Sequence, residues 1–393
     1  MSLFSPLLRL PPRGLAAAAV AARHRLAQAR PRPGRNGGQS RRTPRQAAEG
    51  GAVSVGSGLG LSAFFLFSGE PAQKEGEGDA EGGEAKADPE AAIILVLKKA
   101  KLKIMKGEME EAERLLHEAA WLSQQSNNKA AIIYTYDMMA NLAFLRGELE
   151  KAEKLFKATM SYMLAGDVKQ DDNAILQMSL KLASIYAAQN QDKLALAGYQ
   201  FCILTLEEKV AKQKEMPADA LPEEERSNTH LLLAMTLDSY ARYLLAHQQT
   251  ALAQTMYERA LQIAVEVNGE RHPQTVVVMN DLATALDAQG LYEDAYAQVS
   301  RAAELAQQTQ HPDAPVILNN LAGILIHKGD YSQAQQVYQT ALEVAEKSGD
   351  GVAVRYITKE LAQLAKRKRV RAKARAGLQE MEAGKAGAEG PKE

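Results

Sequence analysis

The sequence predicts an all-α protein, built as a right-handed superhelical array of about six helix pairs with a C-terminal capping helix. Composition is the first observation: the 393 residues are rich in the helix formers Ala, Leu, Gln and Glu, and only 5% are aromatic. A residue string that recurs six times between residues 91 and 365 is the second. The third is segregated charge. The net charge is only −1, yet residues 1–69 hold ten Arg and a single acid.

Residues 1–49 have the composition of a targeting segment. They contain all ten of these Arg, no Lys, and Glu49 as the one acid. An Arg-rich, acid-poor start with a short Ala/Leu helix is typical of a mitochondrial transit peptide. We therefore predict a transit peptide over 1–49, with a disordered basic tail as the alternative.

The next two segments differ sharply in charge. Residues 50–69 carry none, and as a helix they would span about 30 Å, the thickness of a bilayer core. Eight are Val, Leu or Phe, but ten are Gly or Ser, so a candidate transmembrane anchor competes with a flexible linker. Residues 70–90 hold eight acids and four Gly, which predicts a disordered acidic linker because too little apolar surface is available to fold.

The recurring string predicts two antiparallel helices per copy. An apolar–Ala pair is followed by a Gly, an aromatic or apolar residue, a second Ala, a large residue and a third small residue, as in Leu321 to Ala341. The Gly would end the first helix in a left-handed cap. The second Ala would sit where the two helices cross, because only a small side chain allows close approach. It recurs as Ala112, Ala152, Ala195, Ala253, Ala295 and Ala334.

These motifs resemble the tetratricopeptide repeat family over residues 91–365. The steps between copies exceed the usual 34 residues. The long repeats are similar to those of kinesin light chains, because their first helices are Asn-rich and are preceded by His272-Pro273 and His311-Pro312. A proline at a helix start is favoured because its missing N–H would be unsatisfied there. An insertion at 212–226 is predicted to form a charged surface loop.

The array is expected to end in a capping helix over 352–366, because the last pair would otherwise leave a face unburied. Residues 366–393 are predicted to form a basic helix end and a disordered tail. Their basic cluster could bind anionic lipid. No aromatic residue follows Tyr356, so nucleic-acid bases would have no aromatic side chain to stack on, and no nucleic-acid partner is predicted.

The family resemblance implies a concave groove lined by the first helix of each pair. Positions 5, 6 and 9 of the repeat would point into it, and an Asn there could hold the backbone of an extended peptide. The alternative is that these are ordinary helix residues that bond their neighbours. The candidate groove residues are Asn141, Lys181, Arg242, Asn280, Asn319 and Asn320.

Catalytic patterns are missing from the sequence. There is no phosphate-binding Gly-Lys-Ser/Thr loop, and none of the seven His forms an i, i+4 pair. The single cysteine, Cys202, occupies a small-residue position of the third copy, where a buried thiol is expected. We predict no enzyme activity, no cofactor, no metal and no small-molecule substrate.

Three stretches, 134–144, 180–190 and 269–275, resemble a mitochondrial inner-membrane branch of the family. That resemblance implies a non-enzymatic scaffold at the inner membrane. Its partners would be subunits of respiratory complex III, including the Rieske iron–sulfur protein, whose N-terminal fragments it would help to clear. The alternative is a generic peptide-binding adaptor, either a kinesin-light-chain-like cargo adaptor or an import receptor.

Overall fold

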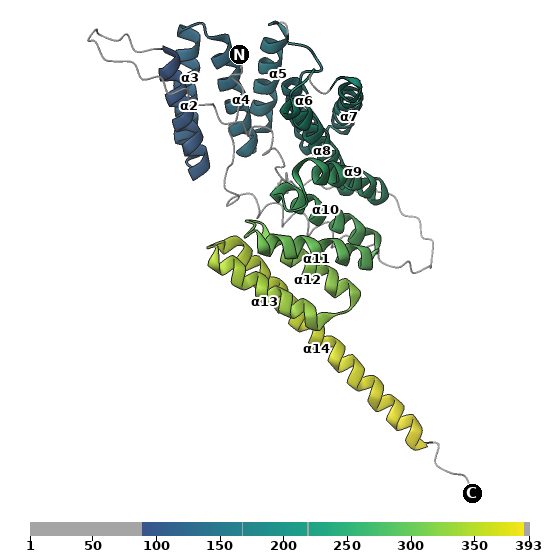
Figure 1. The fold of residues 1–393 in the computed structure, drawn as a ribbon. Helices are drawn as coiled ribbons and strands as arrows, with labels where there is room; N and C mark the ends of the chain where they lie inside the picture. Colours follow the sequence, from purple (N-terminus) through teal and green to yellow (C-terminus); the bar gives the residue numbers. More distant parts are fainter. Residues whose placement is uncertain (1–88, 167, 218–219, 389–393) are drawn as a thin grey trace, which may run out of the picture. The chain divides into compact units, whose positions relative to one another are not determined.

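The computed structural model describes residues 89–166, 168–217 and 220–388, with side chains up to residue 371 (Figure 1). In this part of the chain all regular structure is helical, in thirteen helices without a strand, which confirms the predicted helical repeat array. The chain divides into two compact units, the first ending at His247 and the second beginning at Gln248.

The described part of unit 1 contains seven helices, each packed against the next. Short turns join most of them, so consecutive helices run antiparallel. They are α2 (Pro89–Lys106), α3 (Met109–Gln125), α4 (Lys129–Leu145), α5 (Leu149–Leu164), α6 (Asn173–Ala188), α7 (Asp192–Glu215) and α8 (Glu223–Ala246).

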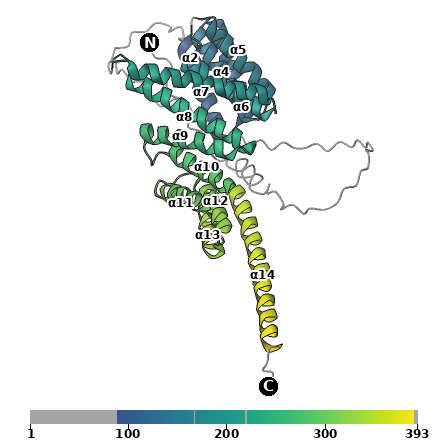
Figure 2. The same ribbon diagram turned by 90° about the vertical axis from the view of Figure 1, so that its right-hand side faces the viewer.

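As far as residue 388, unit 2 contains six helices in the same serial packing. They are α9 (Thr250–Asn268), α10 (Pro273–Gln289), α11 (Tyr292–Gln308), α12 (Ala314–Lys328), α13 (Tyr331–Lys347) and α14 (Gly351–Ala388). The first part of α14 packs on α13, and the rest projects beyond the unit (Figure 2). The pairs α2/α3 to α12/α13 are the six copies of the repeat, and the fourth, α8/α9, is divided between the units.

The turn inside a pair requires one residue in the left-handed region. Glycine occupies it in four copies with φ of +75° to +90°, which confirms the predicted caps, at Gly107, Gly147, Gly290 and Gly329. Asn190 and Gln248 take the same place in the third and fourth copies, with φ of +59° and +60°.

The small residues of the repeat lie at helix crossings. All six predicted packing alanines, from Ala112 to Ala334, are fully buried. The crossing of α6 and α7 shows how tight the approach is: a Cβ added to Gly198 would lie 2.8 Å from the Cβ of Ala183. Larger side chains at such positions would push the helices apart.

The two His-Pro motifs lie just before the first helices of the last two copies. In each, the Nδ1 of His272 or His311 accepts a hydrogen bond from the backbone N–H two residues later, at 3.3 and 3.0 Å. Pro273 is at the first position of α10, as predicted. The prediction for Pro312 is wrong, because α12 begins at Ala314 and Pro315 takes the early position instead.

Two segments that were predicted to be irregular are helical in part. The insertion at 212–226 is not mainly a loop, since α7 continues to Glu215 and α8 begins at Glu223. The expected disordered tail is wrong as far as Ala388, because α14 runs without a break to that residue. Both segments are rich in Ala, Glu, Lys and Arg, whose helix propensity sustains the extensions. The transit peptide, the anchor and all but the last two residues of the acidic linker lie outside the described residues; those two begin α2.

Candidate peptide-binding face

The six candidate groove residues all lie on first helices of the repeat, which places them on α4, α6, α8, α10 and α12. We call this set the first-helix face. Within the set, Lys181 bonds to Asn141 in unit 1, and Asn320 bonds to Asn280 in unit 2.

In unit 1 the face centres on a buried lysine. The Nζ of Lys181 on α6 donates to the Oδ1 of Asn141 on α4 at 2.7 Å, and it lies 4.0 Å from a carboxylate oxygen of Asp137. The amide of Asn141 donates to the Oδ2 of Asp137 at 2.9 Å. The ring of Phe156 lies beneath the ammonium, with its centroid 5.3 Å away. Lys181 therefore links two successive first helices through one charge and one amide.

Burial controls the chemistry of this lysine. Only 8% of Lys181 is exposed, and desolvation lowers its pKa from the ordinary value, while the charge of Asp137 opposes that shift. Because a buried ammonium needs partners, Asp137 and Asn141 compensate it in this position. A partner peptide could reach Asn141 and Asp137, which are half-buried, more readily than Lys181.

On α8, Arg242 forms an ion pair with Asp238, one helical turn earlier. Asp238 is almost completely buried, and the guanidinium is partly exposed. Sequence reasoning selected Arg242 and Asn141 but missed Asp238 and Asp137. The signal was present in both cases, since each acid precedes its partner by four residues, the spacing that faces two side chains toward each other on a helix.

In unit 2 the face is a short amide ladder. Asn320 on α12 donates from Nδ2 to the Oδ1 of Asn280 on α10 at 2.8 Å, and Asn280 donates to the Oδ1 of Asp281 at 3.1 Å. Asn280 is only 1% exposed and Asn319 is buried too. The prediction that Asn280 points into an open groove is wrong, because its amide is enclosed and used to join two helices.

Many of the six candidate residues are therefore helix residues that bond their neighbours, which was the alternative to an open groove. Asn280, Asn319 and Lys181 are interior, whereas the remaining candidates are half-buried and could touch a partner: Asn141, Arg242 and Asn320.

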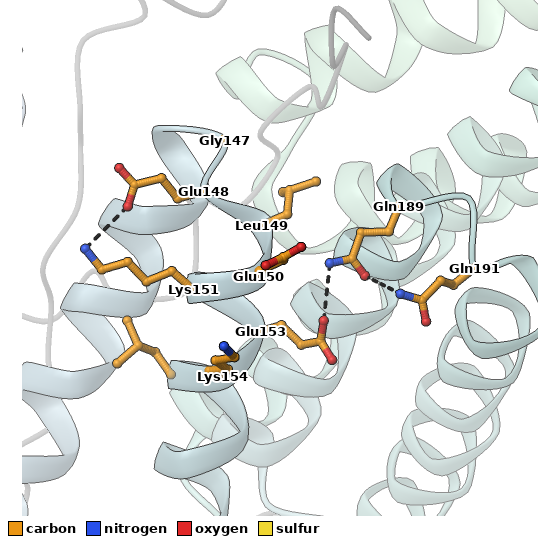
Figure 3. A pocket seen from close by; sticks show the side chains of 10 residues that line it. Gly147, Glu148, Leu149, Glu150, Lys151, Glu153, Lys154, Gln189 and Gln191 are labelled. Atoms are coloured by element: carbon orange, nitrogen blue, oxygen red, sulfur yellow. Dashed lines mark hydrogen bonds and ion pairs between the residues drawn. The ribbon is translucent and has the colours of Figure 1, made fainter.

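A wide hollow of about 1180 Å³ opens at the start of α5, beside the turn between α6 and α7 (Figure 3). Five of its seven charged and amide residues are bonded to each other. Glu153 accepts from the Nε2 of Gln189 at 3.2 Å, Gln191 donates to Gln189 at 2.6 Å, and Lys151 pairs with Glu148 at 3.3 Å. Such a mixed and self-satisfied lining suits contact with a polar protein surface better than capture of a small molecule.

The described part of the chain holds neither an exposed cysteine nor a cluster of metal ligands. Cys202 is buried on α7, and desolvation raises its pKa to about 12, so its thiol stays neutral. No group of three or more His, Cys, Asp or Glu residues within the described ranges could hold a metal ion.

Comparison with known proteins places the chain in a family. Models of the tetratricopeptide repeat match residues 232–308 and 317–352. Tetratricopeptide repeat protein 19, mitochondrial, of Homo sapiens is 52% identical over 314 residues, which cover 79% of this chain and 82% of that protein. The chain belongs to the tetratricopeptide repeat protein 19 family. The Rattus norvegicus member is 56% identical over 310 residues, covering 79% of this chain and 84% of its own.

Among solved structures, BtubC from P. vanneervenii is similar with a TM-score of 0.47 and 17% identity, over 66% of this chain and 92% of its own. Tetratricopeptide repeat proteins are in general non-enzymatic scaffolds for other proteins. The tetratricopeptide repeat protein 19 members compared above are named as mitochondrial. None of the helices in the described ranges combines the length and apolar character needed to cross a membrane.

Proposed function

We propose that this protein is a non-enzymatic scaffold at the mitochondrial inner membrane that binds respiratory complex III. It would preserve the complex by promoting clearance of N-terminal fragments of the processed Rieske iron–sulfur subunit. Membership of the tetratricopeptide repeat protein 19 family is the observation that carries this proposal, since it extends over four-fifths of the chain. The Arg-rich start of the sequence supports import into mitochondria.

The first-helix face supplies the contacts that such a scaffold needs. Asn141 and Asn320 offer half-buried amides that can donate to and accept from a peptide backbone, and Arg242 offers a guanidinium for a carboxylate. Their neighbours hold them in place, since Asn141 is fixed by Asp137 and Arg242 by Asp238. Preorganised side chains lose little entropy when a partner binds.

Complementation tests the proposal. Cells lacking their own family member would receive this chain, tagged at its C-terminus. We expect complex III to co-purify with it and Rieske N-terminal fragments to disappear from mitochondria. The triple variant Asn141→Ala, Arg242→Ala, Asn320→Ala should lose both effects, while the exposed second-helix control Gln336→Ala keeps them. Persistence of the fragments with the unaltered chain would refute the proposed role.

A generic peptide-binding adaptor is the second candidate, and the polar first-helix face favours it independently of complex III. It predicts that the triple variant loses other captured proteins while complex III never co-purifies.

A further inference from the structure

The outward side of α7 carries an apolar stripe. Leu194, Phe201 and Leu204 are 49%, 43% and 66% exposed, and Ala197 between them is exposed as well. The opposite side of the same helix is already used, since it buries Ala195, Tyr199, Cys202 and Leu206 inside unit 1. The α7 stripe, defined as these four exposed residues, is therefore not needed for packing within the described part of the unit.

The repeat itself shows that this stripe is unusual. The second helices align on their buried small residues, so each has four positions that match the α7 stripe. In α13 all four are polar: Gln333, Gln336, Thr340 and Glu343. In α11 three are polar, namely Asp294, Arg301 and Glu304, and the fourth is Ala297. Three of the four are polar in α3, α5 and α9 as well. Of the six described second helices, α7 alone is apolar at all four positions. Helix positions that face water are normally polar.

The spacing of the stripe fits a partner helix. Leu194 and Phe201 are seven residues apart, as are Ala197 and Leu204, and the two series alternate by three and four. This is the period at which two helices pack side chains into each other's gaps over two heptads. The surface is thus suited to a single helix with a similar apolar seam.

We propose that the partner is α7 of a second copy of this chain, packed antiparallel about a two-fold axis. An axis at the level of residue 199 pairs Leu194 with Leu204 of the second copy, and Ala197 with Phe201 of the second copy. Phe201, the largest side chain of the stripe, thus packs against Ala197, the smallest, at two symmetry-related places. The interface is self-complementary, as a two-fold contact must be.

Charge also favours this orientation, although Glu208 pairs with Lys212 of its own helix as well. Lys193 lies at one end of the stripe and Glu208 at the other. In the antiparallel arrangement Lys193 lies within three residues of Glu208 of the second copy along the axis, about 4.5 Å, which long side chains span. A parallel pair would place Lys193 beside Lys193 and Glu208 beside Glu208, which is unfavourable.

The size of the surface sets the strength of the association. Four side chains on one helix cover much less than the roughly 800 Å² per partner of a standard stable interface. The dimer is therefore a weak one, and it is best trapped by cross-linking in the intact organelle rather than sought after dilution.

Disulfide cross-linking of the full chain in isolated mitochondria tests the proposal. The double variant Leu194→Cys, Leu204→Cys should form a disulfide-linked dimer under mild oxidation. Each single variant should not, because identical positions are offset by ten residues, about 15 Å, beyond the reach of a disulfide. The unaltered chain is a clean background, since Cys202 is buried and neutral. Equal dimer from the single variants, or a cross-link to a different protein, would overturn the arrangement.

A charge on the stripe provides the second measurement. Phe201→Arg copies the residue that α11 carries at the matched position, Arg301, so the helix is expected to tolerate it. Added to the double-cysteine variant, it should reduce the dimer about tenfold, which corresponds to roughly 1.4 kcal/mol. Thr340→Arg, at the matched position of α13, is the control and should leave the dimer unchanged. Undiminished dimer with Phe201→Arg, at unchanged helicity, would refute the role of the stripe.

Discussion

Replacing Asn280 with alanine measures how far the first-helix face is structural. The amide accepts from Asn320 at 2.8 Å and donates to the carboxylate of Asp281 at 3.1 Å, in a site that is 1% exposed. A neutral hydrogen bond contributes about 1 kcal/mol and one to a charged group about 2 kcal/mol. Asn280→Ala should therefore lower the free energy of unfolding by about 3 kcal/mol.

A double-mutant cycle isolates the link between α10 and α12. Asn320→Ala removes only the neutral bond, and we expect a loss of about 1 kcal/mol because Asn320 itself is half-buried. The double variant should then be less destabilised than the sum of the two, with a coupling energy of about 1 kcal/mol. Urea denaturation followed by circular dichroism gives all four free energies.

The opposite results would refute this reasoning. A coupling energy near zero would mean that Asn280 and Asn320 do not bond in solution. If Asn280→Ala is fully stable but no longer captures a partner, Asn280 contacts the partner and does not stabilise the fold. Thermal unfolding gives an independent check, because about 3 kcal/mol corresponds to a melting temperature roughly 6–12 °C lower in a protein of this size class.

Five other substitutions test three particular features. Asp137→Asn should destabilise by about 2 kcal/mol more than Lys181→Met in urea denaturation, because Asp137 can be hydrated when alone whereas the buried ammonium of Lys181 cannot. Burial lowers the pKa of His311 below 6.5, so the unfolded chain binds the proton more readily; stability should fall as pH drops below about 6.5, and His311→Gln should flatten that profile. Gln248→Gly should raise the melting temperature by relieving about 1 kcal/mol of left-handed strain, whereas Gly290→Ala should lower it by a similar amount.

The sequence was most informative where one residue type has one physical reason. Only glycine adopts the left-handed cap without strain, and only a small residue fits a helix crossing, so the helix pairs could be placed from Gly329 and Ala334 in the clearest copy. Boundaries were less predictable. The charged residues of 212–226 and 366–388 are compatible with a solvated helix as well as with a loop, and charge alone does not decide between the two.

The candidate site was predicted only in part, for a related reason. Repeat position determines the helix and the side on which a residue lies, and all six candidates are on first helices. It does not determine whether a polar side chain meets solvent or a neighbouring helix. Asn280 and Lys181 meet neighbours 40 residues away in the chain, and such a contact depends on the spacing between helices that the pattern leaves open.

The residue type is therefore determined by different causes at two kinds of repeat position. The buried small residues, such as Ala195 and Ala295, are alike in every copy because a common crossing geometry requires them. The outward positions of the second helices have no such requirement, and they are mostly polar in five copies simply because water surrounds them. An apolar residue such as Phe201, at a place where α11 has Arg301, is consequently not explained by the fold. It is explained by a contact outside the unit, and the α7 stripe is where this array departs most clearly from its own pattern.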